Sequence, residues 1–109
     1  MVDQKLVNHE ILLSFWKIHV LHHASEGGVV GTWMLQELHH HGYEVSPGTL
    51  FPLLKRMERF GWLDSMAEGD GPRARRTYTI TDSGREVLAI ARRQLRELGV
   101  EVGKQQENE

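Results

Sequence analysis

The sequence contains no cysteine. Disulfide bonds, thiolate catalysis and cysteine-bearing zinc or iron-sulfur sites are therefore excluded. Long apolar runs are also missing, since no stretch approaches the roughly 20 residues that a membrane-spanning helix needs. The N-terminus lacks the basic segment, the apolar run and the small-residue cleavage site of a secretory signal. We therefore expect a soluble, cytoplasmic protein.

The chain has 109 residues, which fits a single domain. A domain of this size buries only about two thirds of the surface of its unfolded chain, so a partner subunit that covers more apolar area would stabilise it. Homo-oligomerisation is a reasonable expectation on these grounds.

The charge of the chain is unevenly distributed. The formal net charge of −2 argues against indiscriminate binding of nucleic acid. Residues 1–46 carry two basic and five acidic side chains, whereas residues 47–93 carry nine basic and six acidic ones. The basic residues of the second part are grouped at 55–59 and at 73–76. A surface that binds nucleic-acid phosphates is therefore expected only around these two basic segments.

Two helices are predicted in the first half of the chain. Eight of the eleven residues at 11–21 are apolar, and a helix that is apolar on nearly all sides is buried on more than one side. We expect one side to pack in its own domain and another against a second subunit. The second helix covers 32–40, with Thr32 as its N-cap and Gly42 as its C-terminal stop.

A third helix is predicted from about Ser46 to Phe60, with Gly61 as its terminator. Apolar residues recur at helical spacing on one side, and basic residues occupy the other. Pro52 lies inside this segment, where a proline costs about 3 kcal/mol. We therefore expect an irregular first turn, or a helix that begins nearer Thr49.

The pattern then changes to that of a β-hairpin followed by a helix. Residues 62–66 and 73–80 are predicted as two short strands around the turn-forming segment 68–72. Thr81, Asp82 and Ser83 supply the cap of the last helix. Its apolar residues step by three and four, which is the spacing of a coiled-coil seam: Leu88, Ala91, Leu95, Leu98 and Val102.

These elements predict a mainly α protein with a small β-hairpin. Their order is that of a winged helix-turn-helix, in which three helices precede a two-stranded wing. Residues 1–80 form the predicted DNA-binding domain, residues 81–103 a dimerisation helix packed on it, and residues 104–109 a flexible tail. In this fold the third helix lies in the major groove and the wing tracks the adjacent phosphates.

Two segments resemble the PadR family of transcriptional regulators. The run SPGTLFPLLKRMERFGWL at 46–63 resembles that family's recognition helix, and RRTYTITDSG at 75–84 resembles its wing strand and the start of its last helix. The resemblance implies a homodimer of the small subgroup, which represses a neighbouring gene until a small aromatic or hydrophobic effector releases it. Phe51 stands where the family usually has tyrosine, so the phosphate contact of that hydroxyl is missing.

The position of each residue in this scheme predicts its role. The predicted DNA contacts are Ser46, Thr49, Phe51, Lys55, Arg56, Arg59, Arg73, Arg75 and Arg76. The predicted dimerisation residues are Leu12, Phe15, Trp16, Leu88, Ala91, Leu95 and Leu98. Trp16 and His19 are predicted to bind the effector, because a flat ligand stacks well on an indole.

Seven histidines raise the question of a metal site. His19 has His22 or His23 at helical spacing, and a second cluster occupies 39–41. Imidazoles at this spacing can bind zinc or copper. The second cluster, however, lies where histidine favours the helix dipole, and no carboxylate pattern completes a site. The sequence therefore predicts solvated histidines, with no metal and no cofactor.

An enzyme is not indicated. The chain has no nucleophile elbow, phosphate-binding glycine loop or paired carboxylates. The main alternative to a DNA-binding regulator is a winged helix that serves as a protein-interaction module, with the third helix docked on a partner protein. A salt titration separates the two, because binding to phosphates releases counterions and weakens steeply with salt.

Overall fold

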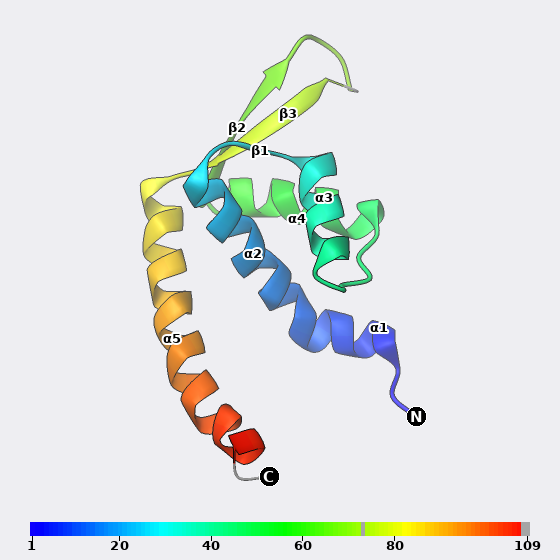
Figure 1. Ribbon diagram of the computed structural model, residues 1–109. Coiled ribbons are helices and arrows are strands. Elements are labelled where there is room, and N and C mark those ends of the chain that lie inside the picture. The colour runs from blue at the N-terminus through cyan, green and yellow to red at the C-terminus, as the bar shows by residue number, and fades with distance from the viewer. Residues whose placement is uncertain (73, 108–109) are drawn as a thin grey trace.

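The chain folds into helices around a small sheet (Figure 1). The computed structural model describes the backbone of residues 1–72 and 74–107 and the side chains as far as residue 103. The elements in chain order are α1 Gln4–Val7, the π-helical turn η1 Asn8–Leu12, α2 Leu13–Glu26, β1 Val29–Val30, α3 Gly31–His40, α4 Pro47–Arg59, β2 Leu63–Glu68, β3 Arg75–Ile80 and α5 Asp82–Glu107.

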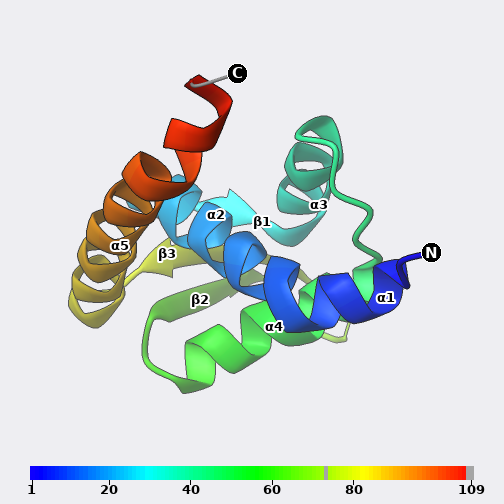
Figure 2. The same ribbon diagram turned by 90° about the horizontal axis from the view of Figure 1, so that it is seen from below.

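The first helical region is longer than the predicted segment 11–21. It runs from α1 through η1 into α2 and ends at Glu26, immediately before Gly27 and Gly28. Asp3 caps its start, because its carboxylate accepts a hydrogen bond of 3.0 Å from the backbone N–H of Lys5. α2 lies at the centre of the molecule, with α5 on one side and α3 on the other (Figure 2).

The predicted cap of α3 is wrong. Val30 is the N-cap and the helix begins at Gly31, so Thr32 is already inside it. The reason is the preceding strand, since Val30 pairs with Thr77 of β3 and the chain passes directly from β1 into α3. Val30, whose backbone is extended, is therefore the N-cap, although the local sequence favoured Thr32.

The predicted C-terminal ends of α3 and α4 are confirmed. Gly42 and Gly61 have φ angles of +92° and +81°, the left-handed conformation that glycine adopts without strain. At each end the next residue donates its backbone N–H to a carbonyl five residues earlier, Tyr43 to Leu38 and Trp62 to Met57. This is the Schellman arrangement, which satisfies carbonyls that the helix leaves open.

α4 begins at Pro47 and contains Pro52 without an interruption. The first turn is thus helical, in contrast to the expected irregular start. Pro47 lies in the first turn, where its missing N–H has no helical partner. The carbonyl that Pro52 leaves without a donor belongs to Gly48, which is exposed, so water can bond to it.

The sheet has three strands in the order β1-β3-β2, all antiparallel. β2 and β3 form the predicted hairpin, with Leu63 opposite Ile80 and Glu68 opposite Arg75. The third strand, β1, was not predicted, because two residues are too short to show an alternating pattern. The far end of the hairpin projects from the body of the molecule as a wing (Figure 1).

α5 is capped by Thr81, whose hydroxyl accepts a hydrogen bond of 3.0 Å from the backbone N–H of Gly84. The same hydroxyl donates to the carbonyl of Gly61 and so ties α5 to the end of α4. The helix continues to Glu107, four residues into the segment predicted as a tail, while residues 108–109 lie outside the described part of the chain. Of the helices that the structure describes, none is long and apolar enough to cross a membrane.

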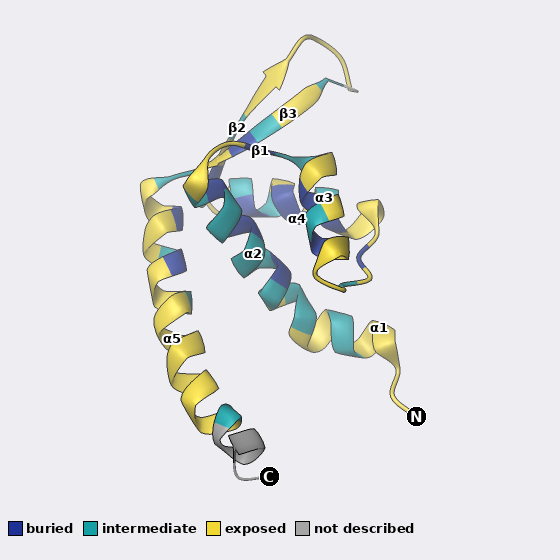
Figure 3. Cartoon of the chain, in the orientation of Figure 1, coloured by how far each residue is buried: buried dark blue, intermediate teal, exposed yellow. Residues whose placement is uncertain are grey.

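The core lies where α2, α3 and α4 meet the base of the sheet (Figure 3). Leucine and methionine side chains from these helices fill most of it, and Val29, Leu63 and Tyr78 contribute from the strands. α5 adds Leu88. Residues 92–102 of α5 are exposed (Figure 3) and lie beyond the core.

Candidate functional site

The exposed side of α4, together with its N-cap residue, carries four of the nine predicted DNA contacts. Ser46 and Thr49 are exposed at its start, and the Ser46 hydroxyl donates a hydrogen bond of 3.2 Å to that of Thr49. Lys55 and Arg59 are exposed about two and three turns further along, whereas Arg56 is half-buried. The helix therefore presents polar residues at its start and cations toward its end.

The wing meets α4 through a short chain of hydrogen bonds. Arg76 of β3 donates a bond of 3.0 Å to the Ser65 hydroxyl of β2, which in turn donates a bond of 2.7 Å to the Glu58 carboxylate of α4. Lys55, Glu58, Arg59 and Arg76 line one surface hollow. We call this hollow the basic hollow. The fold thus brings cations from both basic tracts to one place.

Other residues of the predicted DNA set lie elsewhere. Arg75 lines a different hollow, together with Trp33 and His23, because successive residues of a strand point to opposite faces. Phe51 is half-buried and packs against the core, with its ring next to Gly31. Its position makes it a packing residue rather than an exposed contact. Arg73 lies outside the described residues.

A groove of about 420 Å³ lies between α2 and α5. Of the two residues predicted to bind the effector, His19 lines this groove and Trp16 does not. Arg92 bounds the groove from α5 and places its guanidinium 3.0 Å from Nδ1 of His22. The lining residues are Phe15, Ile18, His19, His22, Tyr43, Leu88, Arg92 and Leu95.

Trp16 does not face outward, so the prediction that it meets a second subunit or an effector is wrong. It is 2% exposed and lies in the chain's own core. Tyr43 packs edge-on against it, with ring centroids 6.2 Å apart. Within the described residues its indole N–H is buried without a hydrogen-bond partner. The helix carrying it is apolar on nearly all sides, and that pattern did not reveal which side faces inward.

The sequence did not point to Tyr43 or Arg92 as residues of the groove. Tyr43 belongs to the connection between α3 and α4, and Arg92 lies on α5 beside the apolar seam. No sequence pattern around Tyr43 or Arg92 marks it as a groove residue, because each lines the groove only after separate elements have packed together.

The predicted dimerisation residues differ in exposure along the chain. Leu12 and Phe15 of the first helical region are half-buried. On α5 the exposure of the seam rises toward the C-terminus: Leu88 is 3% exposed, Leu95 is 38% exposed and Leu98 is 54% exposed, with Ala91 half-buried between the first two. The first turns of the seam thus pack on α2, and the later ones are open.

The three helices, the antiparallel wing and the basic hollow define a winged helix-turn-helix protein. Residues 20–90 match the Transcriptional regulator PadR-like family. The transcriptional regulator Rv3488 of Mycobacterium tuberculosis is 50% identical over 86 residues, which are 79% of this chain and 80% of that protein. The chain therefore belongs to the PadR-like family of transcriptional regulators, and it is not an enzyme.

Solved structures of this family have the same fold. A PadR-like regulator from Bacillus cereus is 26% identical with a TM-score of 0.77, covering 95% of this chain and 99% of that one. A family member from Eggerthella lenta is 28% identical with a TM-score of 0.72, covering 97% of both chains. PadR of Bacillus subtilis, solved with operator DNA, is 21% identical with a TM-score of 0.59, covering 67% of this chain and 44% of that one.

Proposed function

We propose that this chain is a homodimeric repressor that binds an operator with α4 in the major groove and the wing on the adjacent backbone. A small aromatic or hydrophobic effector then releases it from the DNA. Its place of action is the compartment that holds the DNA, the cytoplasm. The basic hollow carries the first part of this proposal, because it joins cations of α4 and of the wing on one surface.

The arrangement of charges in the hollow suits a phosphate backbone. Lys55 and Arg59 project from α4, and Arg76 approaches from β3 across the hydroxyl of Ser65. Phosphate contacts of this kind fix the register of a protein on the duplex, while residues in the groove read the bases. Thr49, exposed at the start of α4, is suited to the second role. PadR of Bacillus subtilis, which has a similar fold, was solved with operator DNA, and this supports duplex DNA as the partner.

Two copies are needed to place two recognition helices about 34 Å apart, the spacing of successive major grooves on one side of the duplex. The open part of α5 supports such a dimer. Leu98 and Val102 of the seam are 54% and 61% exposed, and a second subunit would remove them from water. Burial of apolar surface at such a seam contributes about 25 cal/mol per Å².

The groove between α2 and α5 is the site that we infer for the effector. It is lined largely by apolar side chains, with His19, Tyr43 and Arg92 as polar groups that could orient a ring and its substituents. A ligand there touches both helices that we assign to the dimer. It releases the operator only if it binds more tightly to a dimer conformation whose recognition helices are wrongly spaced for DNA. A ligand with equal affinity for this conformation and for the DNA-binding one would not shift the equilibrium between them.

DNA binding is tested with Lys55→Ala and Arg76→Ala. Fluorescence anisotropy is measured on a duplex selected from a random pool and on a scrambled duplex, each over a range of salt. Both variants should weaken both complexes, and the salt slope should fall by about one for each phosphate that the variant no longer neutralises. Arg93→Ala, an exposed cation on α5, is the control and should leave both affinities unchanged. Unchanged affinity and slope in the hollow variants would favour the protein-interaction module instead.

The effector site is tested by filling the groove. Ile18→Trp places an indole inside it, and Ile90→Trp, at a position 56% exposed on α5 and outside the groove lining, is the control. A series of substituted phenols is screened for release of the wild type from the selected duplex. The phenol that releases the wild type should fail to release Ile18→Trp and should still release Ile90→Trp. Release of all three proteins at the same concentration would remove the groove from the proposal.

A further inference from the structure

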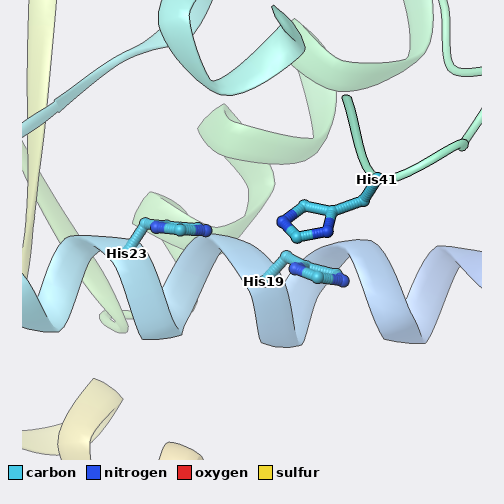
Figure 4. A group of neighbouring side chains, drawn as sticks. All are labelled: His19, His23 and His41. Atoms are coloured by element: carbon cyan, nitrogen blue, oxygen red, sulfur yellow. The ribbon is translucent and has the colours of Figure 1, made fainter. Parts of the chain in front are cut away.

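Three histidines, two on α2 and one directly after α3, lie together (Figure 4). His19 and His23 are one turn apart on α2 and share one side of it, and His41 follows the end of α3. One ring nitrogen of each lies within 4.8 Å of those of the other two. The ring centroids of His19 and His41 are 4.9 Å apart, and Figure 4 shows the His41 ring beside that of His19.

A carboxylate adjoins this cluster. Oε2 of Glu37, one turn before His41 on α3, lies 3.3 Å from Nε2 of His23 and 3.5 Å from Nε2 of His41. In a tetrahedral zinc site with bonds of about 2.0–2.1 Å, neighbouring ligand atoms are about 3.3 Å apart. Glu37 therefore already stands at ligand spacing from two of the histidines.

We propose that the three histidines and Glu37 form a tetrahedral Zn²⁺ site that clamps the end of α3 to α2. The set of three imidazoles and one carboxylate is of the kind that binds zinc in proteins. The predicted absence of a metal site assumed that no carboxylate accompanies the histidines. The fold supplies it, because Glu37 and His41 share a side of α3 that packs toward α2.

The surroundings of the cluster favour metal binding. The hydroxyl of Tyr43 lies 3.3 Å from Nε2 of His19, so it can orient this ring and leave Nδ1 for the metal, as outer hydrogen bonds do in zinc sites. Burial lowers the pKa of His19 and of His23, which favours the neutral imidazole that binds metal. His19 and His23 are half-buried and His41 is exposed, so the ion has access from solvent.

A second group competes for one of these ligands. His22, His23 and Glu26 also lie within 4.8 Å of one another. All three come from the end of α2, the Glu26 side chain is 63% exposed, and the guanidinium of Arg92 is 3.0 Å from Nδ1 of His22. A cation at that distance opposes a metal ion, so the group that includes Glu37 is the better site.

The test measures Zn²⁺ binding to the tag-free, metal-free protein by competition with a chromophoric chelator. We expect one ion per chain. His19→Gln, His41→Gln and Glu37→Gln should each lower the affinity by at least about tenfold, the scale on which even outer-shell changes act. His40→Gln is the matched control, since it lies next to His41 in the sequence but outside the cluster, and its affinity should equal that of the wild type. Circular dichroism confirms that each variant is folded.

Two further readouts make the result decisive. Co²⁺ in place of Zn²⁺ should give the intense visible absorption of a tetrahedral ion, and His41→Gln should weaken that absorption. Saturating Zn²⁺ should raise the melting temperature of the wild type and of His40→Gln more than that of His41→Gln, because the ion binds only the folded site. The proposal is overturned if His40→Gln loses as much affinity as His41→Gln. It is equally overturned if His22→Gln and Glu26→Gln abolish binding while His41→Gln and Glu37→Gln do not.

Discussion

Ser65 on β2 donates a hydrogen bond of 2.7 Å to the carboxylate of Glu58 on α4. The same hydroxyl accepts a bond of 3.0 Å from Arg76 on β3. One hydroxyl therefore sets the wing against the helix that we place in the major groove, and it separates an arginine from a carboxylate within the basic hollow. We therefore expect the orientation of Arg76 to depend on this hydroxyl.

Replacing Ser65 by alanine should weaken DNA binding. Arg76 loses its acceptor and Glu58 its donor, so operator and scrambled duplex should both bind several-fold less tightly in anisotropy titrations. The free energy of unfolding in urea should fall by about 1 kcal/mol, the usual net value of one hydrogen bond. Ser14→Ala, at an exposed position of α2, should change neither quantity. Wild-type affinity in Ser65→Ala would show that the wing does not need this link.

Thr49 and Arg56 should contribute to base recognition more than to general affinity. Thr49 is exposed at the start of α4, the part of a recognition helix that enters the groove. If Thr49→Ala or Arg56→Ala removes a base contact, discrimination at one base pair should fall by about 1–3 kcal/mol. Binding to scrambled duplex should change less. Affinities for a set of single-base operator variants provide the measurement, and a uniform loss across all duplexes would assign the residue to phosphate.

Leu98→Glu should dissociate the proposed dimer. A charge at this exposed position of the seam must lose its hydration when a second subunit covers it. Val100→Glu is the matched control, because it is the same kind of change on the same helix about 200° around its axis. Val100 lies there among Arg93, Arg96 and Glu97. Sedimentation should show a monomer for Leu98→Glu and a dimer for Val100→Glu, and equal masses would contradict the assigned face.

Gly84→Ala should destabilise the fold. A Cβ at this position would overlap the carbonyl oxygen of Trp62 and Cγ1 of Ile80, so the first turn of α5 would have to move away from the end of α4. We expect a loss of about 1–3 kcal/mol in the free energy of unfolding, the range for overpacking.

Gly99→Ala provides the control for that loss. It lies on the same helix with no atom within 4 Å of the added Cβ, and should increase stability by about 0.5–1 kcal/mol through helix propensity. Urea denaturation should therefore show a lower free energy of unfolding for Gly84→Ala and a higher one for Gly99→Ala. A gain in both variants would contradict the close approach of Gly84 to Trp62.

The free energy of unfolding should fall at alkaline pH because of Tyr78. Burial raises the pKa of Tyr78 above its ordinary value of 10.0, and Glu58 raises it further while Arg76 lowers it. Well below pH 10.0 the phenol is protonated in both the folded and the unfolded state, so its ionisation does not affect stability. As the pH rises from there through the folded pKa, the unfolded state ionises first and stability is lost. Tyr78→Phe should show a smaller loss over this range in urea titrations, and parallel curves would contradict the assignment.

Local sequence determined most of the secondary structure. The ends of α3 and α4 follow from Gly42 and Gly61, whose backbone conformation suits glycine and needs no distant partner. The hairpin and the start of α5 likewise follow from turn residues and from Thr81. Two of the exceptions are Thr32 and the strand β1. Both depend on pairing with β3, which lies more than forty residues away.

The sequence also predicted that the chain is a DNA-binding protein, because its two basic tracts and the order of its helices and strands are those of a winged helix-turn-helix. Which side of a strand or helix each residue occupies was less accessible. Arg75 and Arg76 are neighbours in the sequence but line different hollows. Phe51 turns toward Gly31 and the core, a direction that follows only from how α3 packs on α4.

Only the tertiary structure determined that Trp16 is buried and that the histidines lie together. A helix that is apolar on nearly all sides has no pattern to mark its inner face, so only packing placed Trp16 in the core. His41 and Glu37 reach His23 because α3 lies beside α2. Backbone conformational preferences act over a few neighbouring residues. A binding site, in contrast, combines side chains that are distant in the sequence, and the packing of the helices determines which of them lie close together.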